Sequence, residues 1–137
     1  MVRKEVLRKR LNKLEEYIGI LKSLQKYDYN EFVSDPEHYG SAERFLHLAI
    51  EAAIDMGNHV ISDLNLGIVN WYSDIPNILL KHNYLKPDLT ERWIKMIGFR
   101  NTLVHDYIAI DRKIVYNVLN NDLNDLDELK KCFAKFL

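Results

Sequence analysis

The run from residue 100 to residue 107 holds a group of side chains suited to acid–base chemistry on phosphate. Arg100, Asn101 and His105 lie close together in this 137-residue sequence. A histidine ordinarily titrates near neutral pH, so it can take up or release a proton. An arginine offers a planar fork of N–H donors that fits phosphate oxygens and stabilises charge building at phosphorus. This set suits cleavage of a phosphodiester bond, and no metal is required where the nucleophile is the 2′-hydroxyl of an RNA.

A predicted helix that opens near residue 88 presents this run. At 100° per residue, a set of apolar side chains shares an arc of about 100° and is predicted to be buried. That set is Trp93, Ile94, Ile97, Val104 and Ile108. Asn101 falls inside the arc, Arg100 and His105 lie at its two edges, and Tyr107 lies beside Arg100. Burying such polar groups without partners costs on the order of 1–3 kcal/mol each. They therefore either satisfy one another or line a groove.

The spacing alone leaves a plainer interpretation open, because an arginine, asparagine or histidine at the edge of a helix is usually an ordinary hydrogen-bonded residue. On an ideal helix Arg100 and His105 are about 140° apart, so they would flank a cleft rather than touch. Asn101 and His105 are four residues apart and can be neighbours.

A second predicted helix, over residues 36–62, carries apolar residues on two sides and is expected at the centre of a bundle or at a dimer seam. Its narrow polar strip includes His47, Glu51, Asp55 and Asn58. This strip is either a solvated face or the wall opposite Arg100, with Glu51, Asp55 or Asn58 supporting the arginine or the histidine. The spacing of His47, Glu51 and Asp55 also allows metal ligation, but the Glu-x-x-His pairs of di-metal bundles are absent. We expect no metal.

The remaining chain also follows helical patterns. Apolar residues recur at helical spacing over residues 3–26, and the stretch from Asp28 is expected to break that helix. Asp35 before Pro36 is typical of a helix start. Ser73 is expected to cap a helix over residues 73–81, and Asp88 with Glu91 to form a capping box. Further helices are expected after Asp111 and from residues 120–127 to about 136. The predicted fold is all-α, an up-and-down bundle of five to six helices in a single domain over residues 1–137.

Bulk composition restricts the partners. The net charge is −1, from 19 basic and 20 acidic residues, which argues against a general nucleic-acid binder and makes any RNA contact local. The single cysteine, Cys132, allows no intramolecular disulfide and no thiolate zinc site. No apolar run approaches the roughly 18 residues of a membrane span, so we expect a cytoplasmic protein without a membrane partner.

The run Arg-Asn-Thr-Leu-Val-His-Asp-Tyr over residues 100–107 resembles the signature of HepT-like proteins of the HEPN superfamily. That signature has an arginine, a polar residue, three further residues, a histidine, one residue and a tyrosine. Residues 42–46 and 55–59 of the second predicted helix resemble the same family. The resemblance extends over about residues 3–136, and the chain does not depart from the motif.

The resemblance implies a metal-independent endoribonuclease toxin that needs no cofactor. Arg100 and His105 would be catalytic, and the residue pattern adds Asn101, Glu51 and Asp55 as supporting residues. It implies a homodimer in which the two motifs face each other across one composite cleft. It also implies a small nucleotidyltransferase antitoxin as partner, which adenylylates Tyr107. The alternative is a catalytically silent HEPN module that binds a nucleotidyltransferase or a nucleotide without cutting RNA.

Overall fold

The computed structural model of the chain describes residues 1–105 and 110–137. Seven helices lie in these residues: α1 (Lys4–Leu24), α2 (Tyr29–Ser34), α3 (Pro36–Asp63), α4 (Asp74–Lys81), α5 (Pro87–His105), α6 (Arg112–Asn121) and α7 (Leu123–Ala134). The predicted all-α class is confirmed, with a helix more than the expected five to six. No helix in the described ranges is long and apolar enough to cross a membrane.

The additional helix is α2, which occupies the stretch expected only to break the helix before it. Asp28 ends the preceding segment and also caps the next one. The Glu31 N–H donates to Asp28 Oδ1 at 2.8 Å, and the Asp28 N–H donates to Glu31 Oε1 at 3.1 Å. This reciprocal pair is a capping box. The buried Phe32 then attaches the short helix to the core.

Helix α3 is the axis of the molecule and contacts each of the other six helices in the described structure. It is 28 residues long, which corresponds to about 42 Å at 1.5 Å per residue. Its start is as predicted, because the Asp35 carboxylate accepts the Glu37 N–H at 2.9 Å and Pro36 occupies the first helical position. The prediction that this helix is buried on two sides is confirmed.

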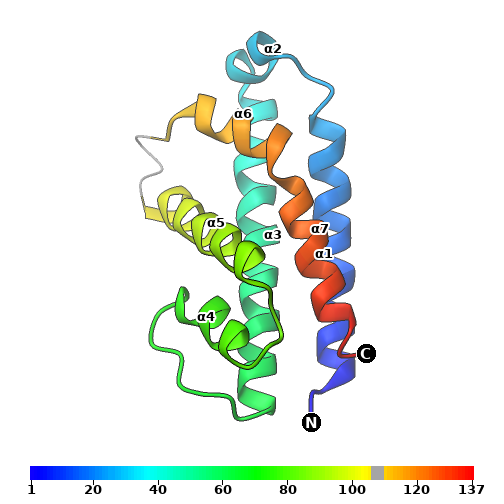
Figure 1. Ribbon diagram of the computed structural model, residues 1–137. Coiled ribbons are helices and arrows are strands. Elements are labelled where there is room, and N and C mark those ends of the chain that lie inside the picture. Colours follow the sequence, from blue (N-terminus) through cyan, green and yellow to red (C-terminus); the bar gives the residue numbers. More distant parts are fainter. Residues whose placement is uncertain (106–109) are drawn as a thin grey trace.

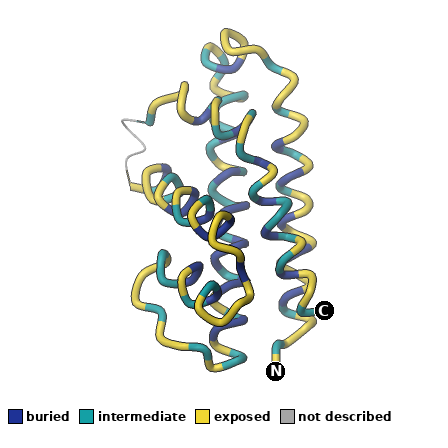
Figure 2. The backbone as a smooth tube through the Cα atoms, in the orientation of Figure 1, coloured by how far each residue is buried: buried dark blue, intermediate teal, exposed yellow. Residues whose placement is uncertain are grey.

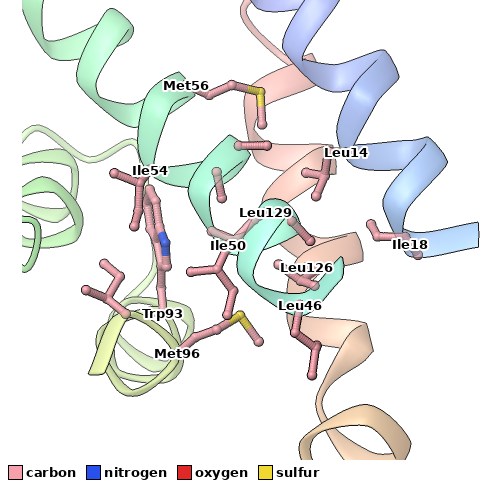
Figure 3. Close-up of a cluster of buried hydrophobic side chains, with 14 of the residues drawn as sticks. Leu14, Ile18, Leu46, Ile50, Ile54, Met56, Trp93, Met96, Leu126 and Leu129 are labelled. Atoms are coloured by element: carbon pink, nitrogen blue, oxygen red, sulfur yellow. The ribbon is translucent and has the colours of Figure 1, made fainter. Parts of the chain in front are cut away.

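The other helices are divided between the two sides of α3. In Figure 1, α1 and α7 lie on one side and α4 and α5 on the other, with α2 and α6 at one end. Figure 2 shows that the buried parts of the tube face α3, while the outer faces of α1 and α5 are exposed. Figure 3 shows part of the core that joins the two sides, with Trp93 packed beside Ile54 and Ile50.

Two helix starts differ from prediction. Ser73 precedes α4 but forms no side-chain cap; the Asp74 carboxylate instead accepts the backbone N–H groups of Asn70 and Trp71, at 3.0 and 2.9 Å. Helix α5 begins at Pro87, so Asp88 lies inside the first turn and cannot be its N-cap. The Asp88 carboxylate accepts a hydrogen bond from Arg92 Nη2 at 3.1 Å.

Candidate active site

An open cavity of about 590 Å³ lies between α5 and the segment that precedes α4. Arg100, Asn101 and His105 all line it, so one cavity contains the polar set that the sequence singled out. The lining residues are Asn70, Trp71, Tyr72, Ser73, Ile94, Ile97, Gly98, Arg100, Asn101 and His105. A cavity of this size is within the range of small-molecule and nucleotide sites.

Arg100 is held by a carboxylate from the central helix. Its Nε donates to Glu51 Oε2 at 2.8 Å and its Nη2 approaches Glu51 Oε1 at 3.4 Å. Its Nη1 donates to Asn101 Oδ1 at 3.0 Å. The side chain of Arg100 is only 11% exposed. A guanidinium carries five N–H donors, so these contacts fix its plane and leave donors free for a phosphate.

Tyr72 completes the surroundings of Arg100 from the α4 side. The Arg100 Cζ atom lies 5.0 Å from the centre of the Tyr72 ring, which is a cation–π distance. Glu51 from α3 and Tyr72 from the segment before α4 therefore hold the same guanidinium. The position of Arg100 depends on three elements and not on α5 alone.

His47 joins this cluster one turn before Glu51 on α3. Its Nε2 lies 3.6 Å from Glu51 Oε2. Burial lowers the pKa of His47 below its ordinary value of 6.5, and the nearby cation of Arg100 acts in the same direction, while Glu51 opposes them. His47 is therefore mainly neutral at neutral pH. In the described ranges, no three His, Cys, Asp or Glu side chains gather in a way that could hold a metal ion.

The cavity corrects the predicted burial of α5. Ile94 and Val104 belong to the predicted buried arc but are only half-buried, and Asn101 is exposed and lines the cavity, in agreement with the groove alternative. Met96 and Leu103, which lay outside that arc, are buried instead. The reason is tertiary: α5 packs on α3 with one part of its apolar surface, and the stripe through Ile94 forms the wall of the cavity.

Asp55 does not join the cavity. It lies one turn beyond Glu51 on α3 and borders a separate shallow hollow with Arg10 and Lys13 of α1. Burial raises the pKa of the Asp55 carboxyl, and Arg10 partly offsets this. Of the two acidic residues that the sequence left open as partners of Arg100, the structure brings only Glu51 into contact with it. Tyr107 and Ile108 lie outside the described residues.

Trp71 and Tyr72 line the cavity opposite α5 and were not predicted to belong to the site. The signal available in the sequence was a pair of adjacent aromatic residues flanked by Asn70 and Ser73. Asparagine and serine are common in turns. An aromatic pair in a connection between helices is more often exposed than one within a helical stripe. Nothing in the linear sequence indicated that this pair would lie beside Arg100.

The helical bundle with its Arg/His cavity matches a known class of proteins. A family model described as ribonuclease HepT-like matches residues 14–133, and the chain belongs to this HepT-like family. The predicted resemblance and the predicted enzyme class, a ribonuclease, are therefore confirmed at the level of the family.

Individual relatives cover most of the chain. It is 30% identical over 120 residues to the mRNA nuclease HepT of Shewanella oneidensis, covering 86% of this chain and 90% of that protein. It is 31% identical over 117 residues to the tRNA nuclease HepT of Aphanizomenon flos-aquae, covering 84% and 78%. A solved structure of the tri-AMPylated Shewanella oneidensis HEPN toxin in complex with MNT antitoxin is similar, with a TM-score of 0.87, 25% identity, and coverage of 95% of this chain and 97% of that chain.

Proposed function

We propose that the chain is the toxin of a toxin–antitoxin pair and acts as a metal-independent endoribonuclease through Arg100 and His105. The observation that carries the proposal is the fixed guanidinium of Arg100, held by Glu51 in a cavity that His105 and Asn101 also line. An arginine whose plane is set before substrate arrives can stabilise charge as it develops at phosphorus. His105, exposed at the cavity, is the group that moves protons.

The proposed reaction is an internal displacement at phosphorus. His105 takes the proton of the RNA 2′-hydroxyl, and that oxygen forms a bond to the adjacent phosphorus. The bond from phosphorus to the 5′-oxygen breaks, and the leaving oxygen is protonated by a second acid. The products are a 2′,3′-cyclic phosphate and a 5′-hydroxyl end. Asn101, which accepts a hydrogen bond from Arg100, supports the guanidinium from its own helix.

A homodimer supplies the second acid in this scheme. The resemblance implies that two Arg/His motifs face each other across one composite cleft, and the open form of the cavity on the single chain supports a cleft that a second copy completes. One imidazole would then remove the proton while the other delivers one. Such a division of roles is common in acid–base catalysis of phosphodiester cleavage.

The antitoxin proposal rests on the Shewanella oneidensis toxin, whose solved structure is a complex with MNT antitoxin and carries AMP groups. We infer that a partner nucleotidyltransferase transfers AMP from ATP to the hydroxyl of Tyr107. The tyrosine oxygen forms a bond to the α-phosphorus of ATP, the tyrosine proton is lost to solvent, and pyrophosphate leaves. Helical spacing predicts Tyr107 beside Arg100, and a phosphate attached there would compete with RNA for the same N–H donors.

Expression in growing cells tests the nuclease. Wild-type protein is expected to arrest growth and fragment RNA with 2′,3′-cyclic phosphate ends, and His105→Ala is expected to do neither while keeping the wild-type circular dichroism spectrum. His82→Ala is the matched control, because His82 is exposed and lies outside the cavity. RNA cleavage that persists in folded His105→Ala would overturn the proposal. A soluble wild type with no effect would support the silent docking module instead.

The antitoxin proposal is tested by co-expressing the chain with a small nucleotidyltransferase that is encoded next to the gene of the chain. Intact mass is expected to rise by one or more AMP groups and growth to recover. Tyr107→Phe is expected to remain unmodified. Modification of the Tyr107→Phe protein to the same extent would assign the acceptor to another residue.

A further inference from the structure

Trp71 is a large apolar side chain left in water at the edge of the active-site cavity. It is 75% exposed, while the other tryptophan, Trp93, is fully buried in the core. Its neighbour Tyr72 is 41% exposed and faces Arg100. Aromatic side chains in such a position commonly mark a binding surface, because an uncovered indole forgoes the free energy of burial.

The segment that carries Trp71 is anchored in place. The carboxylate of Asp74 accepts the backbone N–H of both Asn70 and Trp71, at 3.0 and 2.9 Å. The Asp74 N–H returns a bond to the Trp71 carbonyl at 2.9 Å, and the Ile75 N–H donates to the Tyr72 carbonyl at 3.1 Å. The exposed indole is therefore presented by a hydrogen-bonded turn that leads into α4.

The cavity lining combines two chemically different groups of side chains. Trp71, Ile94 and Ile97 give it an apolar and aromatic part, and Arg100 with His105 gives it a cationic and acid–base part. A nucleotide has the same division between a flat base and a phosphate. Single-stranded RNA is recognised largely by stacking of splayed bases on aromatic rings, with arginine at the phosphates.

We propose that Trp71 is a base-stacking residue that holds the nucleobase adjoining the scissile phosphate of a single-stranded RNA. This inference rests on the proposed ribonuclease function and adds the substrate class and the residue that engages it. Tyr72, whose ring lies against the Arg100 guanidinium, acts as a positioning residue for Arg100. With a net charge of −1, the chain has few phosphate contacts to offer, so stacking has to supply much of the affinity.

Binding of an uncleavable probe tests this without relying on catalysis. The probe is a fluorescein-labelled 2′-fluoro oligoribonucleotide of about 8 nucleotides in which every base occurs, and the readout is anisotropy with the full chain. Trp71→Ala is expected to raise Kd by roughly 5- to 100-fold, and Trp71→Phe by no more than about threefold. Ile68→Ala is the matched control, because Ile68 is 80% exposed nearby but does not line the cavity. We expect its Kd to match that of the wild type.

A second arm identifies the contact as one with a base. Each nucleotide of the probe is replaced in turn by an abasic one. At the stacked position the abasic probe is expected to bind wild type more weakly, by about the same factor as Trp71→Ala weakens the intact probe. When Trp71→Ala is combined with the abasic probe, the affinity should fall little further than with either change alone, as expected for directly interacting groups. A merely structural role of Trp71 would give independent effects at every position.

The outcomes separate this inference from the ribonuclease proposal. If the wild-type protein binds the probe through Trp71 but cleaves no RNA, the base-stacking proposal holds and the ribonuclease proposal fails. Wild type that cleaves RNA while Trp71→Ala binds the probe equally well overturns the base site alone. If Trp71→Ala loses the mass of a dimer in light scattering, the indole belongs to a contact between copies and the base-stacking proposal is overturned. A wild-type protein that does not bind the probe would overturn it as well.

Discussion

Arg100 shows how a single side chain is held in position by partners distant in the sequence. Its guanidinium bonds to Glu51 at 2.8 Å across 49 positions of sequence. The ion pair with Glu51 offsets part of the positive charge that attracts phosphate, but it fixes the plane of the Arg100 guanidinium. Preorganised donors contribute most to catalysis when they need not rearrange during the reaction. Glu51 is therefore proposed to act through Arg100 as a positioning residue and not on the substrate.

Glu51→Gln is expected to lower kcat for RNA cleavage by roughly 10- to 100-fold with a smaller change in KM, because a loosened Arg100 is misplaced at the transition state. Folding stability should change little, since the Glu51 side chain is 31% exposed and solvent can hydrate what remains. The measurement is steady-state cleavage of a fluorogenic RNA. Asp55→Asn is the matched control on the same helix, and we expect it to retain wild-type kcat. Equal losses in both variants would contradict a specific role for Glu51.

The lowered pKa of His47 predicts a pH dependence of stability. Burial disfavours protonation in the folded state, so the unfolded chain binds this proton more readily. The stability that His47 contributes is present above its ordinary pKa of 6.5 and is lost as the pH falls through the lower folded-state pKa. His47→Asn should therefore show a shallower fall in Tm than wild type between about pH 7 and 5. Thermal unfolding followed by circular dichroism measures the slopes, and identical slopes would refute the assignment.

At the scale of the elements, the cavity depends on how closely α4 and α5 approach α3. Gly57 of α3 lies under both helices. A Cβ at this position would meet Ile75 Cγ2 and would also lie 3.0 Å from Trp93. Both neighbours are fully buried and cannot swing into solvent. The absence of a side chain at Gly57 therefore lets α4 and α5 approach α3 closely.

Gly57→Ala is expected to destabilise the fold by about 1–3 kcal/mol, the usual cost of overpacking, despite the better helix propensity of alanine. The displaced α4 should also weaken cleavage, because Tyr72 would move from Arg100. Gly19→Ala on α1 is the control: a Cβ there would meet nothing within 4 Å, and we expect a gain of up to about 1 kcal/mol. Chemical denaturation provides both values. An unchanged free energy of unfolding in Gly57→Ala would show that α4 shifts without loss of stability and would contradict the prediction.

For the whole molecule, the balanced charge limits how it can hold RNA. The 19 basic and 20 acidic residues give a net charge of −1. Part of the basic charge is already paired, as in the contacts of Arg92 with Asp125 and Glu128. Recognition therefore has to depend on local contacts within the cavity and on a few phosphates.

This balance predicts a weak salt dependence of RNA binding. For single strands, the slope of log K against log salt is about −0.7 for each phosphate neutralised. With Arg100 and at most one or two further cations engaged, we expect a slope between about −0.7 and −2. Anisotropy titrations of the uncleavable probe over a range of potassium chloride concentrations measure it. A slope steeper than about −4 would reveal an extended basic surface and contradict a purely local site.

The sequence by itself determined the features that depend on short-range chemistry. Helical periodicity predicted α1 and α3, the caps at Asp35 and Asp111 marked helix starts, and residue types singled out Arg100 and His105. These features follow from side chains within a few residues of one another. The same local reasoning missed α2, because a capping residue was interpreted only as a break.

Tertiary structure alone decided which distant groups meet. The choice of Glu51 over Asp55 as partner of Arg100 depends on where α5 crosses α3, because one helical turn moves a carboxylate about 6 Å along the axis toward a different neighbour. The close approach of α4 and α5 to α3 depends on the space that Gly57 leaves for Ile75 and Trp93. Helical periodicity left open whether Asn101 contacts other polar groups or lines a groove, because periodicity gives the direction of a side chain but not what lies opposite it. What faces a side chain is fixed only when the helices pack.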